Sequence, residues 1–263
     1  MDLLRSENLV LGTWSQIASP EVIDIVGASG FAFTIIDCEH GYFGLETAEN
    51  LIRACNAARI APWVRAPKLD PQFIGKALDC GAQYVVVPGI SSGEQAAEAV
   101  AAGRFAPVGT RGACPCVRAG DHYIRDWKAY ARRQHAETGV IALVETRAGL
   151  DDFDRIIATP GLAGLLVGPF DLSVSLGLEG DYLHPTVQDA VRSMIARARE
   201  HGVPVIMPVF SPDLDRAKGQ LDQWRDQGLT VFVVGTDKIL LADQMTRYTE
   251  YLSGKSQHPM VGL

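Results

Sequence analysis

The sequence predicts an α/β protein, a single (β/α)₈ barrel that occupies the whole chain, residues 1–263. Short apolar runs alternate with segments of helical pattern along the entire sequence, which is typical of a parallel sheet covered by helices. A length of 263 residues is ordinary for one such barrel. A hydrophobic content of 47% supplies a large core and argues against disorder.

Eight runs are expected to be strands, and each ends near a polar residue, Gly or Pro: 10–14, 33–37, 62–65, 84–88, 140–145, 162–168, 203–209 and 231–235. Helices are expected between them, opened by Ser19-Pro20, Asp70-Pro71 and Ser92, or carried by segments 45–59, 149–159, 185–202, 212–227 and 236–253. An open doubly wound sheet is the alternative. It would usually carry a G-x-G-x-x-G turn after the first strand, and residues 11–16 lack that pattern.

Two segments extend beyond the repeat. Segment 103–138, between the fourth and fifth strands, is rich in Gly and Pro and then turns polar and helical. We expect this insertion to form a lid over the site, since long connections in barrels often do so. Segment 242–263 is expected to be a C-terminal helix and tail that contacts another subunit.

Composition narrows the partners and the location. A net charge of −7 makes nucleic acid and anionic membranes unlikely partners. No apolar run is long enough to span a bilayer, and the N-terminus does not resemble a signal peptide. Five cysteines without zinc spacing, including Cys114-Pro115-Cys116, fit a reducing compartment. A cytoplasmic protein is therefore expected.

The chemistry of a barrel lies where its strands end at the C-terminal face. These ends carry Trp14, the run Asp37-Cys38-Glu39-His40, Arg65, Glu145 and Asp171. No lysine lies at a strand end, which disfavours a Schiff-base mechanism.

Glu145 and Asp171 follow neighbouring strands, so their carboxylates would repel each other unless a proton or a cation neutralised them. Mg²⁺ or Mn²⁺ suits such hard oxygen ligands. Two alternatives remain open: an ion pair of Glu145 with Arg147 or Arg111, and a role for Asp171 as a helix cap.

The neighbouring strand ends offer a base and a cation. His40 is a candidate general base whose tautomer Asp37 would fix, although a solvated histidine in a turn is the alternative. Arg65 is suited to hold a carboxylate or polarise a carbonyl, or else to form a rim ion pair with Asp70 or Asp37.

The turn Gly168-Pro169-Phe170 opens a short helix. Its backbone N–H groups are expected to bind a substrate carboxylate, and the small Gly168 would let the substrate approach.

Seven motifs in order resemble the HpcH/HpaI aldolase family, the class II pyruvate aldolases: Leu11-Gly12-Thr13-Trp14, Asp37-Cys38-Glu39-His40-Gly41, Val64-Arg65-Ala66-Pro67, Val87-Pro88-Gly89-Ile90, Gly109-Thr110-Arg111-Gly112, Val144-Glu145-Thr146 and Gly168-Pro169-Phe170-Asp171-Leu172-Ser173. The resemblance covers residues 9–235. It implies cleavage of 4-hydroxy-2-oxo acids into pyruvate and an aldehyde, with a divalent cation (Mg²⁺, Mn²⁺ or Co²⁺) stabilising the enolate.

The same resemblance implies a role for each matching residue. Glu145 and Asp171 would hold the metal, and Arg65 would contact pyruvate. His40 would be the base, supported by Asp37 and by a neighbouring subunit's counterpart of Asp79. The family also forms trimers or hexamers with swapped C-terminal helices.

Two positions depart from the family pattern. Leu143 stands where Gln is frequent, and Phe170 stands where a small residue is usual. We expect both, with Trp14, to shape the substrate pocket. Two rival functions remain: a related metal–enolate enzyme (acyl-CoA lyase or oxaloacetate decarboxylase, with Arg111, Arg118 and Arg147 as candidates for CoA phosphates) and a non-catalytic barrel that binds an oxo acid.

Overall fold

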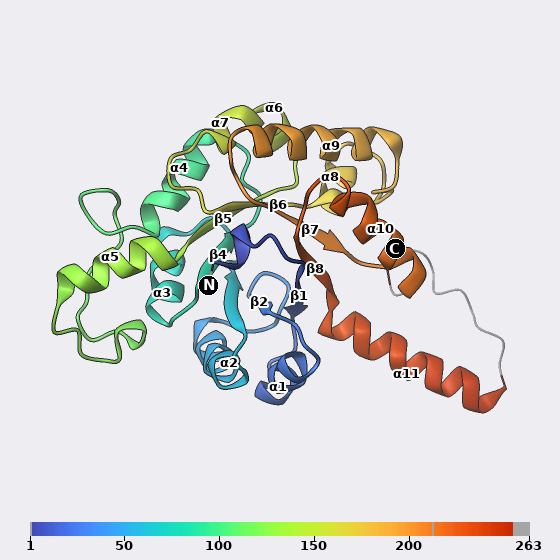
Figure 1. Cartoon of the computed structure of the whole chain (residues 1–263), viewed down its shortest axis with the longest axis horizontal. Coiled ribbons are helices and arrows are strands. Elements are labelled where there is room, and N and C mark those ends of the chain that lie inside the picture. The colour runs from blue at the N-terminus through green and yellow to red at the C-terminus, as the bar shows by residue number, and fades with distance from the viewer. Residues whose placement is uncertain (1, 212, 255–263) are drawn as a thin grey trace.

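The computed structural model describes residues 2–211 and 213–254, and in them eight parallel strands close into a barrel in sequence order (Figure 1). This confirms the predicted (β/α)₈ fold. The strands are β1 Val10–Ser15, β2 Phe33–Asp37, β3 Ala61–Arg65, β4 Tyr84–Val87, β5 Gly139–Val144, β6 Gly164–Val167, β7 Val205–Val209 and β8 Val231–Thr236.

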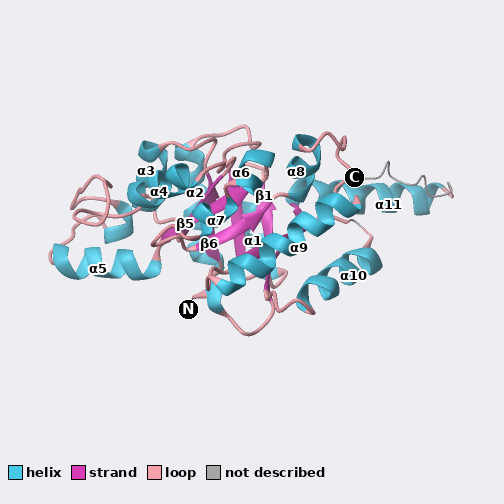
Figure 2. Cartoon of the chain, turned by 90° about the horizontal axis from the view of Figure 1, so that it is seen from above, coloured by secondary structure: helices cyan, strands magenta, loops and turns pink. Residues whose placement is uncertain are grey.

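Helices form the outer layer of the barrel (Figure 2). They are α1 Pro20–Ala28, α2 Leu45–Ala58, α3 Pro71–Asp79, α4 Gly93–Ala102, α5 Trp127–Glu137, α6 Arg147–Asp151, α7 Phe153–Ile157, α8 Pro169–Ser175, α9 Pro185–Glu200, α10 Leu214–Arg225 and α11 Asp237–Ser253. Their starts follow the sequence signals. For example, the Asp70 side chain caps α3 by accepting from the N–H groups of Gln72 and Phe73, with Pro71 at the first position.

The core has two layers, because strands of a closed barrel bury both faces. One cluster fills the space between strands and helices, and a second fills the barrel interior. In the interior, Phe33 stacks on Trp63 with ring centroids 3.9 Å apart. Gly12 makes this possible, since a Cβ there would lie 2.3 Å from the Phe33 ring.

Strand register determines which side chains meet at the C-terminal face. Asp37 and Arg65 are partners in the β2–β3 ladder and end their strands side by side. Val144 pairs with Val167, so Glu145 and Gly168 follow at the same level. The sequence therefore delivers two adjacent pairs of polar or small residues to one rim.

Helix α11 extends away from the barrel, on the side opposite to α5 (Figures 1 and 2). It exposes a series of large apolar side chains: Leu240, Leu241, Met245, Tyr248, Tyr251 and Leu252. The predicted C-terminal segment 242–263 thus begins within α11, and its last residues, 255–263, lie outside the described part of the chain. In the described residues, no helix has both the length and the apolar character to cross a membrane.

Candidate functional site

A cavity of about 330 Å³ opens at the C-terminal face of the barrel. Its lining includes Trp14, His40, Arg65, Phe170 and Asp171. These residues come from different strand ends, as expected for the active site of a barrel.

The best-defined feature of this opening is a fixed guanidinium. Arg65 Nε donates to Asp37 Oδ1 (2.8 Å) and Nη2 donates to Oδ2 (2.6 Å), while Nη1 lies 3.0 Å from Glu39 Oε2. The guanidinium also lies 4.3 Å from the ring centroid of Trp14. A fork paired in this way has little rotational freedom, so its charge is held in one place.

Asp37 holds the Arg65 guanidinium in place and is itself fixed by further hydrogen bonds. Its carboxylate also accepts from the Gln16 side-chain amide (2.8 Å) and from the N–H groups of Glu39 and His40. Burial acts to raise the pKa of Asp37, but the bonds from Arg65 outweigh it and hold the pKa below its usual value. Asp37 therefore stays ionised and anchors Arg65, the pairing that the sequence left as an alternative.

His40 is exposed at the mouth of the cavity. Asp37 binds the backbone N–H of His40 and not its imidazole, so the expected tautomer-fixing bond is absent from the described contacts. The imidazole is thus free to reach a substrate from the rim.

Asp171 lines the cavity, and Glu145 follows β5 at the level of Gly168, close to the start of the helix that carries Asp171. Glu145 Oε1 accepts from the Gly89 N–H (2.8 Å). Burial and the charge of Asp171 raise the pKa of Glu145 to about 7. Burial also raises the pKa of Glu39, with Asp171 contributing. The opening therefore concentrates negative charge that a proton or a cation must offset.

The ion-pair alternative for Glu145 finds no support among the described residues. Arg111 pairs with Asp79 at the opposite end of the barrel, with 2.6 Å between Nη2 and Oδ1. Glu145 forms no ion pair in the described part of the chain, with Arg147 or otherwise.

The donor set fits a hard divalent cation that keeps most of its shell as water and substrate. No group of three or more His, Cys, Asp or Glu suited to a metal occurs among the described residues, but two carboxylates suffice for Mg²⁺. Gly168 makes room beside them: a Cβ at Gly168 would lie 2.6 Å from Glu145 Cβ and 2.8 Å from its Oε2.

The turn 168–170 differs in part from expectation. The Gly168 N–H donates to the Val144 carbonyl (3.1 Å), so it is not available to a substrate carboxylate. Pro169 and Phe170 line the cavity, whereas Leu143 is buried in the barrel interior at 3% exposure and does not.

Segment 103–138 lies at the other end of the barrel. Arg118 donates to the Cys80 carbonyl (2.7 Å) after α3, and Arg104 donates to the Thr138 carbonyl just before β5. Because the segment follows helix α4 and not strand β4, it is placed at the N-terminal face and does not cover this chain's opening as the expected lid would.

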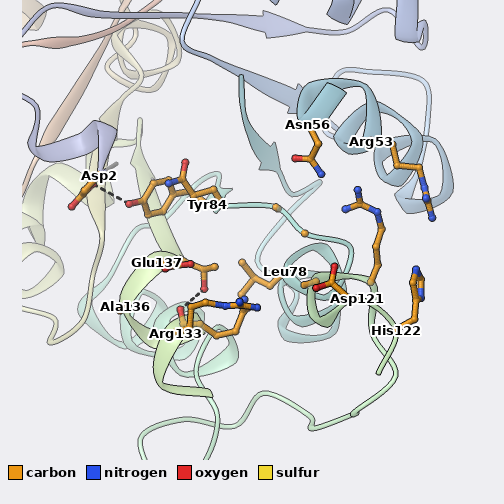
Figure 3. A pocket seen from close by; sticks show the side chains of 17 residues that line it. Asp2, Arg53, Asn56, Leu78, Tyr84, Asp121, His122, Arg133, Ala136 and Glu137 are labelled. Carbon is orange, nitrogen blue, oxygen red and sulfur yellow. Dashed lines mark hydrogen bonds between the residues drawn. The ribbon is translucent and has the colours of Figure 1, made fainter. Parts of the chain in front are cut away.

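The same face holds a larger cavity of about 710 Å³ (Figure 3). Its polar rim mixes Arg53, Arg133 and His122 with Asp121 and Glu137. We place the active site in the smaller cavity, because only that one receives the C-terminal strand ends. Asp79 also lies toward the N-terminal face and cannot join the site of its own chain.

Sequence reasoning assigned no role to Gln16 or Gly89. Gln16 binds Asp37, and Gly89 binds Glu145. Gln16 directly follows β1, and Gly89 lies two residues after β4. This position after a strand end is the signal that could have identified them.

A parallel barrel that gathers a pinned arginine and acidic side chains at the C-terminal ends of its strands has the arrangement of an enzyme active site. The model of the HpcH/HpaI aldolase/citrate lyase family matches residues 11–243, and the chain belongs to this family. It is accordingly a carbon–carbon lyase of the aldolase type, as predicted.

Relatives agree with this assignment. The chain is 32% identical over 236 residues to a 5-keto-4-deoxy-D-glucarate aldolase of Salmonella paratyphi A, covering 89% of this chain and 88% of the relative. An HpcH/HpaI family protein from Burkholderia cenocepacia J2315 is 31% identical, with a TM-score of 0.86 over 95% of this chain and 97% of that one. The citrate synthase SbnG is 28% identical, with a TM-score of 0.82 over 94% and 95%.

Proposed function

We propose that the chain cleaves, or in reverse forms, a 4-hydroxy-2-oxo acid, with pyruvate and an aldehyde as the products of cleavage. The observation that carries this proposal is that the pinned Arg65 guanidinium and the Asp171 carboxylate line one cavity, with the buried Glu145 close enough to Asp171 for that charge to help raise the pKa of Glu145. The relatives named as aldolases support the same bond cleavage.

Glu145 and Asp171 would hold a divalent cation, Mg²⁺, Mn²⁺ or Co²⁺. When bound, such a cation supplies positive charge that stabilises the enolate developing on the 2-oxo acid.

The chain's own groups would do the rest. Arg65 binds the oxo acid and adds positive charge near the enolate oxygen, and it needs no reorganisation because Asp37 already fixes it. His40 removes the proton of the 4-hydroxyl, directly or through a water molecule, and returns it in the reverse direction.

One rival loses ground on geometry. An acyl-CoA lyase needs cations for the CoA phosphates at the mouth. Arg111 and Arg118 lie toward the opposite face. Of the three candidates this leaves Arg147, which is exposed at the start of α6. Arg65 and His40 are the only basic residues that line the described cavity, and Arg65 is already paired.

The test is pyruvate release from a 4-hydroxy-2-oxo acid, assayed before and after chelator treatment and after addition of Mg²⁺, Mn²⁺ or Co²⁺. We expect activity to disappear with the metal and to return with it. Activity that survives chelation but is lost with borohydride in the presence of substrate would contradict the metal-dependent mechanism.

We also propose a homo-oligomer, a trimer or hexamer, in which Asp79 assists a neighbouring site. Two features support assembly: the apolar side chains that α11 exposes, and the position of Asp79 far from its own opening. Sedimentation of the full chain and of Leu241→Asp would test it, and a wild-type monomer would contradict it.

A further inference from the structure

We infer that the aldehyde half of the substrate is uncharged and apolar, with an aromatic or long alkyl body, and carries no carboxylate. This inference rests on the proposed function and concerns the part of the same cavity that lies away from Arg65. It names a substrate class for that part.

The far lining of the cavity is made of large apolar side chains: Phe170, Tyr182, Leu183, Met207, Phe210 and Trp224. They come from α8, the loop after it, β7 with the loop that follows, and α10. Such a surface is suited to bury an apolar or aromatic body, with specificity set by a few polar groups.

Apart from the Tyr182 hydroxyl, the polar side-chain groups of this far lining are amides. Gln188, Gln220 and Gln223 add hydrogen-bonding capacity without charge. The Gln188 amide donates to the Tyr182 carbonyl (2.8 Å), which ties the loop after α8 to helix α9. The far lining is therefore preformed as well as uncharged.

Ionisable acidic and basic side chains in the described lining, His40, Arg65 and Asp171, are confined to the catalytic end. Arg65 lies at the catalytic end, where it pairs with Asp37 and Glu39 and would bind the oxo acid, so it does not serve the far lining. A carboxylate on the aldehyde would therefore lose water at the far lining without gaining a cation there.

Phe170 stands at the border between the two ends. It directly precedes Asp171 on α8, lines the cavity and remains 40% exposed. Gly180 gives its ring a place: with φ at +89°, Gly180 has a conformation that favours glycine, and a Cβ there would lie 3.1 Å from the ring. The exposed part of the Phe170 ring is therefore available to pack against the aldehyde half of the substrate.

The experiment uses the full-length assembled protein with Mn²⁺ and pyruvate. Two pairs of aldehydes are compared: benzaldehyde with 4-carboxybenzaldehyde, and pentanal with 4-oxobutanoate. For the uncharged member of each pair we expect kcat/KM to be at least about tenfold higher. Exchange of pyruvate methyl protons in D₂O, followed by NMR without aldehyde, tests enolate formation on its own.

Three variants locate the effect. Phe170→Ala is expected to lower kcat/KM for the uncharged aldehydes about tenfold relative to Val174→Ala. Val174 is exposed on the same helix and does not line the cavity. Gln220→Arg is expected to raise kcat/KM for the carboxylated aldehydes, since it supplies the missing cation.

The outcomes separate the two proposals. Proton exchange together with a preference for the carboxylated aldehydes overturns the inference and leaves the aldolase function standing. Unchanged selectivity in both Phe170→Ala and Gln220→Arg also overturns it, because the aldehyde would then lie elsewhere. Absence of proton exchange with every metal overturns the proposed function and this inference with it.

Discussion

Replacing Glu145 by Gln should stabilise the metal-free protein while abolishing its activity. The amide keeps the shape of the side chain and an oxygen that can accept from the Gly89 N–H. It removes the charge that burial and Asp171 disfavour. A buried carboxylate that lowers the stability of the metal-free protein is expected where the function requires a bound cation.

The magnitude follows from the pKa of Glu145, which is raised from 4.5 to about 7. The folded protein binds this proton more tightly than the unfolded chain does, so stability falls as the pH rises through that interval. The destabilisation is below about 1 kcal/mol at pH 5 and about 3 kcal/mol at pH 8. Glu145→Gln should recover that difference.

The assay is urea unfolding at one protein concentration with chelator present, at pH 5 and pH 8. Glu98→Gln, on the exposed side of α4, is the matched control and should be neutral at both pH values. Equal stability differences for Glu145→Gln at the two pH values, or destabilisation at pH 8, would refute the reasoning.

Asp37→Asn should leave the Arg65 guanidinium without its bidentate partner, lowering the free energy of unfolding by about 3 kcal/mol and kcat/KM for pyruvate release by about 10²-fold. Normal kinetics in this variant would show that Arg65 needs no anchor. Gly168→Ala places a Cβ 2.6 Å from Glu145 Cβ, so Mn²⁺ affinity measured by calorimetry should fall at least about tenfold. Gly219→Ala, where a Cβ meets nothing within 4 Å, is its control; equal Mn²⁺ affinity in both would contradict the crowding argument.

The barrel could be predicted because its determinants are local. Each strand is a short apolar run that ends near Gly, Pro or a polar residue, and several helix starts carry a capping side chain, among them Asp70 and Ser92. The same logic located the site residues at strand ends, since all parallel strands of a barrel deliver their last residues to one face. Asp37, Arg65, Glu145 and Asp171 needed no more than this rule.

Which of these residues pair with one another depends on register and rotamer, and the sequence contains neither. Asp37 is only three residues from His40 in the sequence, whereas Arg65 lies on the next strand. The β2–β3 pairing places Arg65 directly beside Asp37, and the Asp37 side chain therefore binds Arg65. Arg65, the Gln16 amide and the backbone N–H groups of Glu39 and His40 together occupy both Asp37 oxygens, which leaves neither to orient an imidazole. Closeness in sequence predicted a bond from Asp37 to the His40 imidazole, and that prediction was wrong.

The placement of segment 103–138 shows a different limit. Its length and composition are those of a functional loop, but its side of the barrel depends on whether it follows a strand or a helix. It follows α4, so it shares the N-terminal face with Asp79, which its own Arg111 holds at 2.6 Å. In the oligomer that we propose, Asp79 acts on another subunit, and Arg111 fixes it for that task. The pinned Arg65 and the pinned Asp79 would thus meet only across an interface, which ties the completeness of the site to assembly.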